Sequence, residues 1–564
     1  MDKALFLEYI DETPNIKYVQ DFVELLNFKE DNPLYVFRCK LELTIGKVDI
    51  FLLIPKRFPE YLPKFFLGKF DRLGFMPHIE SNGTICFLEK ESIYINRDEP
   101  NAVFQASVEL AIETLEDGLS GKNHNDFREE FHVFWEQNQY RHPLGVVSQI
   151  KVGSEPKRVS ILKDHQRAVV IDESDNESRH RRFFKKNPMK KSGIYLLLSE
   201  SSKILPPKYD EQWSIEIFTK WIKTNSSVEN WTKVEKILSK KSSKYEYIII
   251  GIPRVSGETI LVGVHLKPKK SKAHPFKGND SDWGLNYLRV VRFDPPSILP
   301  RSGAKSELQN KAVLLIGCGS VGSHIAVDLA KMGIGNLSLI DDDQLKMENI
   351  HRFSVGFEYV NTYKVNTLTN FISKNFIFSK LKPYSLKLET FIDENIALLS
   401  SFDLIISATG DPTINMFLNE KLQQDKIPLI TAWNEPYSIG GHAQLSIPPK
   451  KGCYKCLYRD LYNTASFAAK DQPKPFHKKH LGCGEVFTPF NALDSSRTAE
   501  LTTRLATSFL LNKDEMAQII SWKGDSKEFI QNGFYLSSRY LKQTAEDLTN
   551  RKHNFINPLC NHCS

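Results

Sequence analysis

The order of hydrophobic and polar positions divides the chain into three folded blocks. In the first block, residues 1–145, the run 41–54 predicts two strands around a turn at Gly46-Lys47. Residues 104–135 place apolar side chains at helical spacing, with a break near Gly118–Gly121. Strands followed by helices predict an α+β domain.

The middle of the chain gives a weaker pattern. Residues 146–192 are polar and charged and include the run DESDNESRHRRFFKKNPMKK, so we expect a linker or an exposed loop there. Residues 193–304 contain the strand-like runs GIYLLL, YEYIIIGI and TILVGVHL and one helical run at 211–224. This block is predicted to be a mixed α/β domain, and no motif in it indicates a role.

The third block, residues 305–564, begins with a buried strand at 312–316, a glycine-rich turn and a helix. Two further apolar runs, 336–340 and 402–407, each end in an acidic residue or shortly before one. Repeated strand–helix units predict a doubly wound, Rossmann-like domain. The whole chain is therefore expected to be a multidomain protein of α+β and α/β parts.

Composition adds limits to this picture. The 564 residues are too many for a single core, and 41% hydrophobic with 25% charged residues is ordinary for a globular protein. We expect a cytoplasmic protein, since no window looks like a secretory signal or a membrane span. The formal charge of +7 is small, and the basic clusters at 179–191 and 267–272 lie in polar stretches, so no nucleic-acid partner is expected.

The glycine turn carries the first chemical signal. Gly317, Gly319 and Gly322 form a G-x-G-x-x-G motif between a strand and a helix, where backbone amides at the helix N-terminus can bind a phosphate. Asp341 ends the next strand, and its carboxylate could accept hydrogen bonds from ribose hydroxyls. Up to this point the motif fits an NAD-dependent dehydrogenase as well as an adenylating enzyme, and a doubly wound domain without nucleotide remains the plainer alternative.

Four further residues distinguish these readings: Asn349, Arg352, Lys364 and Asp411 follow the motif in order. With Asp341, this series resembles the ThiF/ubiquitin-activating superfamily over about residues 300–510. The resemblance implies ATP and Mg²⁺ rather than NAD. It places Asp341 at the ribose, Arg352 and Lys364 at the triphosphate and Asp411 at the magnesium, with Asn349 alongside. Fixed cations and a metal suit a reaction in which charge grows on departing pyrophosphate.

Four of the eight cysteines form two Cys-x-x-Cys pairs, Cys453 with Cys456 and Cys560 with Cys563. Two such pairs that meet in the fold supply the four thiolates of a closed structural zinc site. Such a site would hold down the C-terminal segment. Free thiols or a redox pair are the alternatives, and His562 could replace one cysteine as a ligand.

Cys483 lies in the glycine-bounded segment HLGCGEVF, ahead of a helix expected from about residue 493. A helix N-terminus stabilises a thiolate, which is the nucleophilic form. In the ubiquitin-activating enzymes a cysteine in this place accepts the adenylated C-terminus as a thioester, so the resemblance implies this role for Cys483. The alternative is a buried structural cysteine.

Cys86 lies in the run MPHIESNGTICFL, after the proline-rich stretch IPKRFPEYLPKFFL. These features resemble ubiquitin-conjugating domains over about residues 20–140, which implies that Cys86 also carries a thioester. The usual asparagine after the proline is replaced by His78, which could donate a hydrogen bond or act as a base. Cys39 and Cys318 are predicted to be structural.

A conjugating domain followed by an activating domain resembles the E2–E1 fusion proteins of bacterial anti-phage cyclic-oligonucleotide (CBASS) systems. The resemblance implies an acyl relay from an adenylate to Cys483, then to Cys86 and then to a target lysine. It also implies a homodimer and, as substrate, the C-terminus of a cGAS-like nucleotidyltransferase. Two rivals remain: a sulfur-transfer enzyme of the same superfamily that uses Cys483 for persulfide chemistry, and a non-catalytic binding module.

Overall fold

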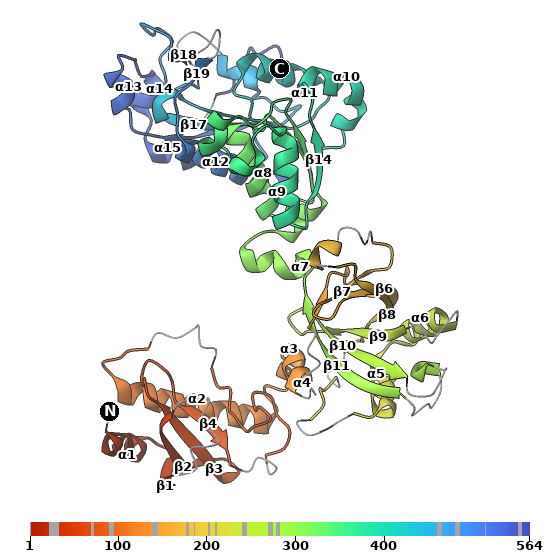
Figure 1. Cartoon of the computed structure of the whole chain (residues 1–564). Coiled ribbons are helices and arrows are strands. Elements are labelled where there is room, and N and C mark those ends of the chain that lie inside the picture. Colours follow the sequence, from red (N-terminus) through yellow and green to blue (C-terminus); the bar gives the residue numbers. More distant parts are fainter. Residues whose placement is uncertain are drawn as a thin grey trace. The chain divides into compact units, whose positions relative to one another are not determined.

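The structure is a computed structural model. It describes residues 2–21, 33–68, 73–88, 95–137, 145–175, 177, 180–184, 186–200, 204–208, 211, 213–239, 245–268, 274–277, 283–458, 465–479, 486–513, 515–550 and 555–563. The chain forms two compact units, Met1–Asp294 and Pro295–Ser564. Figure 1 shows the elements of each unit, and the two units are described separately below.

The first part of unit 1 is a four-stranded antiparallel sheet with helices. Its elements are α1 (Lys3–Glu12), β1 (Ile16–Asp21), β2 (Pro33–Leu43), β3 (Gly46–Pro55), β4 (Lys64–Leu67) and α2 (Pro100–Ser120), with strand order β1-β2-β3-β4. Strands β2 and β3 form the predicted hairpin, but its turn lies at Thr44 and Ile45, and Gly46-Lys47, where the turn was expected, begin β3. Alternate strand residues such as Phe37 and Leu52 are buried in one core with Phe104 and Val108 of α2.

Helix α2 ends where the sequence predicts a break. Gly121 follows the helix with a φ of +73°, a left-handed conformation that glycine adopts without steric cost. Two short helices continue the chain, α3 (Asp126–Glu129) and α4 (Phe131–Gln137). The predicted α+β architecture of this part is confirmed.

The second part of unit 1 is a closed seven-stranded barrel in the order β10-β11-β5-β7-β6-β8-β9. Its strands are β5 (Val146–Ser148), β6 (Lys157–Lys163), β7 (Ala168–Asp172), β8 (Met189–Leu197), β9 (Tyr245–Pro253), β10 (Thr259–Pro268) and β11 (Trp283–Arg292). The prediction of a linker at 146–192 is wrong, because this stretch supplies three barrel strands and the start of a fourth. Short apolar runs such as AVVI at 168–171 are strands, and the charged run that suggested a linker only connects β7 to β8.

Helices α5 (Ile215–Asn225) and α6 (Val228–Ser239) connect β8 to β9 and cover one side of the barrel. Helix α4 packs against the same side through Phe131 and Trp135, both fully buried. The Trp135 indole donates a hydrogen bond to the carbonyl of Gly263, and its ring lies edge-on to Tyr287 at 4.7 Å. The end of the first part is thus built into the hydrophobic core of the barrel.

Unit 2 is a seven-stranded sheet in the order β14-β13-β12-β15-β16-β17-β20. The strands are β12 (Ala312–Ile316), β13 (Asn336–Ile340), β14 (Lys380–Tyr384), β15 (Leu404–Ser407), β16 (Leu429–Asn434), β17 (Gly440–Ser446) and β20 (Gln518–Lys523). The first five strands in this order are parallel to one another. Strand β17 runs antiparallel to β16, and β20 runs antiparallel to β17. The predicted Rossmann-like fold is confirmed.

Helices cover both faces of this sheet. Helices α8 (Ser320–Lys331), α9 (Lys364–Asn375) and α12 (Ala492–Leu510) share one core cluster, and α10 (Leu388–Leu399) and α11 (Pro412–Gln424) share the other. Unit 2 starts at Pro295, ten residues before the expected boundary at 305, because Leu299 and Leu308 of the short helices ahead of β12 are buried.

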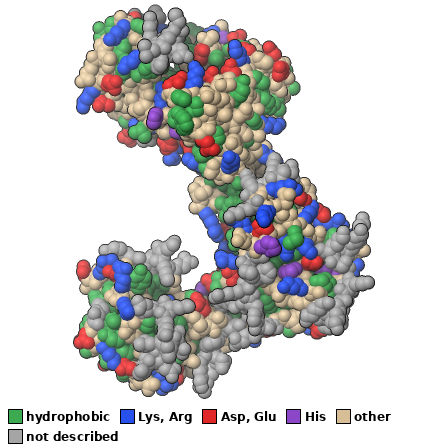
Figure 2. Space-filling view, in the orientation of Figure 1, with side chains coloured by type: hydrophobic (Ala, Val, Ile, Leu, Met, Phe, Trp, Pro, Cys, Tyr) green, Lys and Arg blue, Asp and Glu red, His purple; other side chains and the backbone are tan. Residues whose placement is uncertain are grey.

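Among the described residues, no helix combines the length and apolar character that crossing a membrane requires. On the face shown in Figure 2, Lys and Arg side chains are interspersed with Asp and Glu.

Candidate functional site

The candidate nucleotide site lies at the carboxyl edge of the sheet of unit 2. The strand order reverses between β12 and its neighbour β15, so the connections leave these two strands in opposite directions. Ligands of open α/β sheets bind in the crevice at such a switch point. Gly317, Asp341 and Asp411 all lie just beyond the carboxyl ends of parallel strands, so the fold brings these predicted site residues to one edge.

The glycine turn is shaped by steric exclusion. Gly317 has a φ of +83°, and a Cβ there would lie 2.8 Å from the backbone nitrogen of Thr409. A Cβ on Gly322 would lie 1.9 Å from the carbonyl oxygen of Gly317. At Gly319 a Cβ would meet no atom within 4 Å. The outer glycines therefore permit close backbone packing, and the middle glycine leaves space for a ligand at the start of α8.

Asp341 is fixed by the same turn. Its Oδ2 accepts a hydrogen bond from the Cys318 amide at 2.6 Å, and its Oδ1 accepts one from the Asp343 amide at 2.9 Å. Burial raises the pKa of Asp341, while Lys364 and the two amide hydrogen bonds oppose that rise. The carboxylate is thus oriented before any ligand binds, as a ribose acceptor requires.

Lys364 reaches this carboxylate from the first turn of α9. Its Nζ lies 2.7 Å from Asp343 Oδ2 and 3.9 Å from Asp341 Oδ1, and its side chain is 10% exposed. The structure therefore brings together Asp341 and Lys364, which lie on different elements. The side-chain oxygens of Asp341, Asp342 and Asp343 also lie within 4.8 Å of one another and could hold a cation.

Asn349, Arg352 and Asp411 have local partners in addition to their predicted roles. The Asn349 side-chain oxygen accepts a hydrogen bond from the Lys346 amide at 3.2 Å, which caps a short 3₁₀ helix. The guanidinium of Arg352 lies 5.1 Å from the centre of the Phe490 ring. Asp411 caps α11, because its Oδ1 accepts a hydrogen bond from the Thr413 amide at 2.7 Å.

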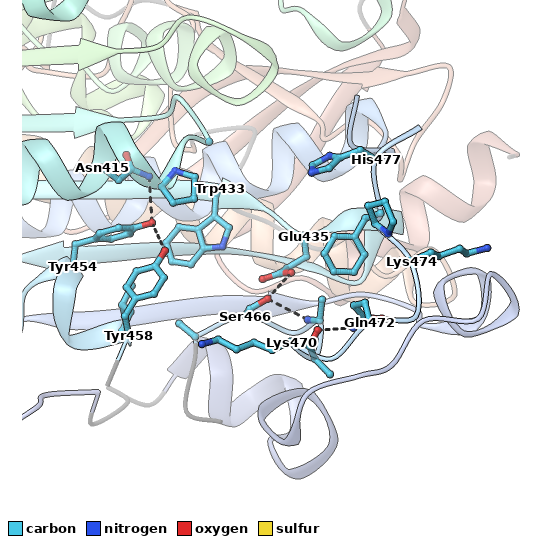
Figure 3. Close-up of a pocket in the computed structure, with 18 of the residues that line it drawn as sticks. Asn415, Trp433, Glu435, Tyr454, Tyr458, Ser466, Lys470, Gln472, Lys474 and His477 are labelled. Carbon is cyan, nitrogen blue, oxygen red and sulfur yellow. Dashed lines mark hydrogen bonds between the residues drawn. The ribbon is translucent and has the colours of Figure 1, made fainter. Parts of the chain in front are cut away.

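A cavity of about 700 Å³ opens beside Asp411. Gly410 and Pro412, the neighbours of Asp411, contribute to its lining, together with Trp433 and Glu435 at the end of β16 and the segment 465–477. Figure 3 shows the aromatic rings of Trp433, Tyr454 and Tyr458 gathered on one side of it. An aromatic cavity with a few polar groups, next to a nucleotide crevice, suits an extended peptide tail.

A buried hydrogen-bonded pair fastens the lining of this cavity to the sheet, and burial lowers the pKa of its histidine, His442. Glu435 and His442 are almost fully buried, and their side chains lie 2.9 Å apart. Glu435 also accepts hydrogen bonds from the Ser466 hydroxyl and the Phe467 amide, which hold the segment 465–477 in place. Although burial opposes it, His442 and these donors lower the pKa of Glu435. The sequence analysis missed this pair, since no motif marks it.

The four cysteines of the Cys-x-x-Cys pairs meet in one buried cluster. The Cys453 Sγ atom lies 4.0 Å from the Sγ of Cys456 and 3.7 Å from that of Cys560. The Sγ atoms of Cys456 and Cys563 lie 3.5 Å apart. Zinc bound to four thiolates at about 2.3 Å sets sulfur atoms at about this separation. The cluster could therefore hold a metal ion. The Nε2 of His562 lies 2.7 Å from Lys455 Nζ, so this side chain has a partner outside the cysteine cluster.

Cys86 is exposed on a loop that pairs with β4 in unit 1. The Gly83 carbonyl accepts from the Leu67 amide, the Phe65 carbonyl accepts from the Ile85 amide, and both bonds are 2.9 Å long. The Cys86 amide in turn donates to the carbonyl of His78 at 2.8 Å. These bonds hold the thiol at a fixed point on the surface.

Acidic side chains surround this thiol. The Cys86 thiol donates a hydrogen bond to Glu80 Oε1 at 3.4 Å. Desolvation is the largest cause that raises the pKa of Cys86, to about 12, and Glu80 and Glu130 add to it while Lys64 opposes it. The thiol is thus protonated near neutral pH, and an incoming ammonium group would find negative charge beside it.

His78 faces two of the acids. Its Nε2 lies 2.9 Å from Asp126 Oδ2 and its Nδ1 lies 3.4 Å from Glu130 Oε1. The residue has a φ of +62°, which is uncommon for a residue with a Cβ. Both ring nitrogens are therefore engaged by carboxylates, an arrangement that suits a residue holding acids in place. The sequence analysis missed Glu80, Asp126 and Glu130, which no motif connects to Cys86.

The other cysteines divide into two groups. Cys39 and Cys318 are fully buried, as expected of structural cysteines, and burial raises the pKa of Cys39 to about 12. Cys483 lies outside the described residues, so its predicted role stays a prediction. The helix expected after it is present as α12, which begins at Ala492 with Asn491 as its N-cap.

Comparison with known proteins agrees with this division of the chain. Residues 297–532 match the model of the ThiF family, and residues 27–142 match the model of Prokaryotic E2 family B. The chain is 23% identical over 558 residues to the "ATP-dependent ubiquitin transferase-like protein Cap2" of Escherichia coli (strain TW11681), covering 89% of each chain. It is 23% identical over 450 residues to the Cap2 protein of Pseudomonas aeruginosa, covering 77% of this chain and 80% of that one.

Among solved structures, Escherichia coli MccB with MccA-N7isoASN aligns with a TM-score of 0.34 at 20% identity, over 47% of this chain and 71% of that chain. The matches to the two family models and to the Cap2 proteins confirm the resemblance stated from the motifs. The chain therefore joins an E2-like domain, which matches Prokaryotic E2 family B, to an adenylation domain, which matches the ThiF family, and it is an ATP-dependent adenylyltransferase.

Proposed function

We propose that this protein adenylates the C-terminus of a partner protein, carries the acyl group on Cys483 and then Cys86, and transfers it to a lysine amine. The observation that carries the proposal is the combination, in one chain, of a nucleotide crevice beside a tail-sized cavity and an exposed thiol on an E2-like loop. Activation and conjugation need these two kinds of site, and neither kind alone explains the chain.

In the activation step, a carboxylate oxygen of the tail attacks the α-phosphorus of ATP and pyrophosphate leaves. Asp341 would hold the ribose, and the amides at the start of α8, next to Gly319, would receive phosphate. Lys364 and Arg352 would stabilise the charge of the triphosphate, with Asn349 alongside, and Asp411 would bind Mg²⁺, which neutralises the leaving group. The cavity next to Asp411 would hold the last residues of the tail.

In the transfer steps, the Cys483 thiolate attacks the acyl carbon and AMP leaves. The Cys86 sulfur then replaces Cys483 at the same carbon, and the lysine nitrogen finally forms the amide bond as the C–S bond to Cys86 breaks. Glu80 lies at the reacting sulfur, so it is placed to take the proton that the amine releases. We assign His78 to holding Asp126 and Glu130 rather than to proton transfer.

Two features support finer parts of the proposal. The relatives named ATP-dependent ubiquitin transferase-like protein support transfer to a partner protein. From the resemblance to E2–E1 fusion proteins, we take this partner to be a cGAS-like nucleotidyltransferase of an anti-phage system and propose that two copies pair through the adenylation domain. The four-cysteine cluster supports a structural Zn²⁺. The rival role in sulfur transfer is less favoured, because it leaves the E2-like domain and the ordered Cys86 loop without a use.

The nucleotide site is tested by ATP–pyrophosphate exchange in the presence of a peptide that carries the partner's C-terminal residues. Lys364→Met should lower the exchange rate about a hundredfold, because it removes a fixed positive charge from the developing phosphate charge. Lys374→Met, an exposed position at the other end of α9, serves as the matched control. Equal rates for Lys364→Met and the control would contradict the assignment of Lys364.

The metal site is tested by the zinc content of the purified protein. We expect one zinc per chain, and Cys560→Ser should lose it and lower the melting temperature, since a ligand from the C-terminal segment is removed. His562→Ala should keep the zinc, because its side chain pairs with Lys455. Full zinc in Cys560→Ser, or its loss in His562→Ala, would show that the ligand set is different.

The acidic surroundings of Cys86 are tested by its alkylation with iodoacetamide, followed by mass spectrometry of the Cys86 peptide. Glu80→Gln should move the pH midpoint of alkylation down, because a carboxylate that disfavours the thiolate is removed. Below the midpoint, the rate rises about tenfold for each pH unit of that movement. Glu109→Gln, exposed on α2, should leave the midpoint unchanged. A midpoint that does not move in Glu80→Gln would refute this role of Glu80.

A further inference from the structure

Helix α3 connects the acids at Cys86 to the barrel. Asp126 and Glu130 are four residues apart, so they lie on one side of the helical turn, and both contact His78. His78 in turn accepts the hydrogen bond from the Cys86 amide through its carbonyl oxygen. The position of α3 therefore decides where Glu130, which acts on the thiol, and Asp126, which holds His78, lie.

The residues between these acids contact the barrel instead. Arg128 donates two hydrogen bonds to the carbonyl of Pro253, at 3.2 Å from Nε and 2.9 Å from Nη2. Glu129 accepts hydrogen bonds from the Ser256 amide at 2.9 Å and the Ser256 hydroxyl at 3.1 Å, and Arg254 Nε lies 2.7 Å from Glu129 Oε2. One short helix thus presents one pair of side chains to the E2-like loop and the other pair to the barrel.

The barrel side of this contact is a tight turn between two barrel strands. Residues 253–258 connect β9 to β10, with Gly257 at a φ of +90° and the Arg254 amide bonded to the Glu258 carbonyl at 2.7 Å. Although burial opposes it, Ser256 and Arg254 lower the pKa of Glu129, so its charged form is favoured in this contact. A turn held between paired strands is a firmer support than a free loop.

Aromatic packing keeps α3 in the same place from its other end. Phe127 of α3 stacks on Phe75 of the E2-like part at 4.6 Å, and it contacts Phe134 of α4 at 5.4 Å. Helix α4 is itself buried in the barrel through Trp135. Phe75 lies three residues before His78, so this stack also connects the barrel to the loop that carries the site.

We propose that the turn 253–258 of the middle barrel is a positioning element of the conjugating site, which fixes α3 so that Asp126 and Glu130 hold His78 and Glu130 stays near the Cys86 thiol. The barrel then has a role that its sequence does not reveal, because it sets the charge around Cys86 on the side where the amine approaches. This inference rests on the proposed function only where it concerns transfer to an amine. The charged groups that act on the thiol are Glu80 on its own loop, Lys64 on β4 and Glu130 at the end of α3, while His78 and Asp126 contact each other beside Glu130.

The test uses the full chain with Arg254→Ala and Ser256→Ala combined, which removes two side chains that bind Glu129 and leaves the E2-like part unchanged. Without this contact, α3 should allow Glu130 to move away from the thiol. Because a carboxylate that disfavours the thiolate is then farther away, alkylation of Cys86 by iodoacetamide at pH 8 should become about threefold faster. Discharge of a preformed Cys86 thioester to free lysine should become slower. Arg254→Lys, which keeps the positive charge, should show smaller changes than the double variant in both the alkylation rate and the discharge rate.

Lys233→Ala is the control, because it removes a different ion pair of the same unit, with Glu155 and Glu229. A fall in melting temperature with an unchanged alkylation profile and discharge rate would overturn the proposal and leave a merely structural contact. Glu129→Gln provides a second variant if the double variant does not fold. Alkylation needs neither ATP nor partner, so it decides the positioning role even if the parent protein forms no thioester, which would instead refute the proposed function.

Discussion

The close packing of the Gly317 turn against the end of β15 is the constraint on which the activating half of the molecule depends. Only a residue without Cβ fits at Gly317 and Gly322, because the neighbouring backbone atoms occupy the space. This packing brings the start of α8, the carboxylate of Asp341 and the N-cap of α11 to one edge of the sheet. The tail-sized cavity lies beside the last of these, so crevice and cavity are consequences of the same strand order.

The two halves of the chain handle charge in opposite ways. The candidate nucleotide site pairs Lys364 with Asp341 and Asp343, so a fixed positive charge lies among acids there. The conjugating site surrounds its thiol with carboxylates, which raise the pKa of Cys86 and suit the approach of an ammonium. A thiol of lower pKa is the better leaving group, so the raised pKa of Cys86 disfavours loss of an acyl group from it to another thiol.

Much of the fold could be predicted from the sequence, because it is encoded in local patterns. The runs at 312–316 and 336–340 are continuous apolar strands bounded by turn residues, and the glycine turn has a spacing that few other structures share. The stretch 146–192 was misjudged because its strands are short and their turns are strongly charged. Closure of the barrel depends on pairing between strands far apart in sequence, such as β5 with β11, which periodicity does not report.

The candidate sites divide in the same way. Asp341, Lys364 and the four clustered cysteines belong to motifs that can be recognised in the sequence. The structure brings Asp341 and Lys364 together, and it gathers the four cysteines in a separate cluster. The contacts of Glu435 with His442, of Glu80 with Cys86 and of Asp126 with His78 are made only in three dimensions. Each looks like an ordinary charged residue in the sequence, and only the folded structure shows which atoms lie next to it.

The central claim is that Cys86 receives an acyl group activated by the adenylation domain. Intact-mass spectrometry of the purified protein with ATP, Mg²⁺ and the partner nucleotidyltransferase, under non-reducing conditions, tests it most directly. We predict an ATP-dependent, thiol-sensitive adduct of partner mass that maps to Cys86, that stalls on Cys483 in Cys86→Ala and that is absent in Cys483→Ala. No adduct on either cysteine, in a protein that still exchanges pyrophosphate, would contradict the relay and favour sulfur transfer.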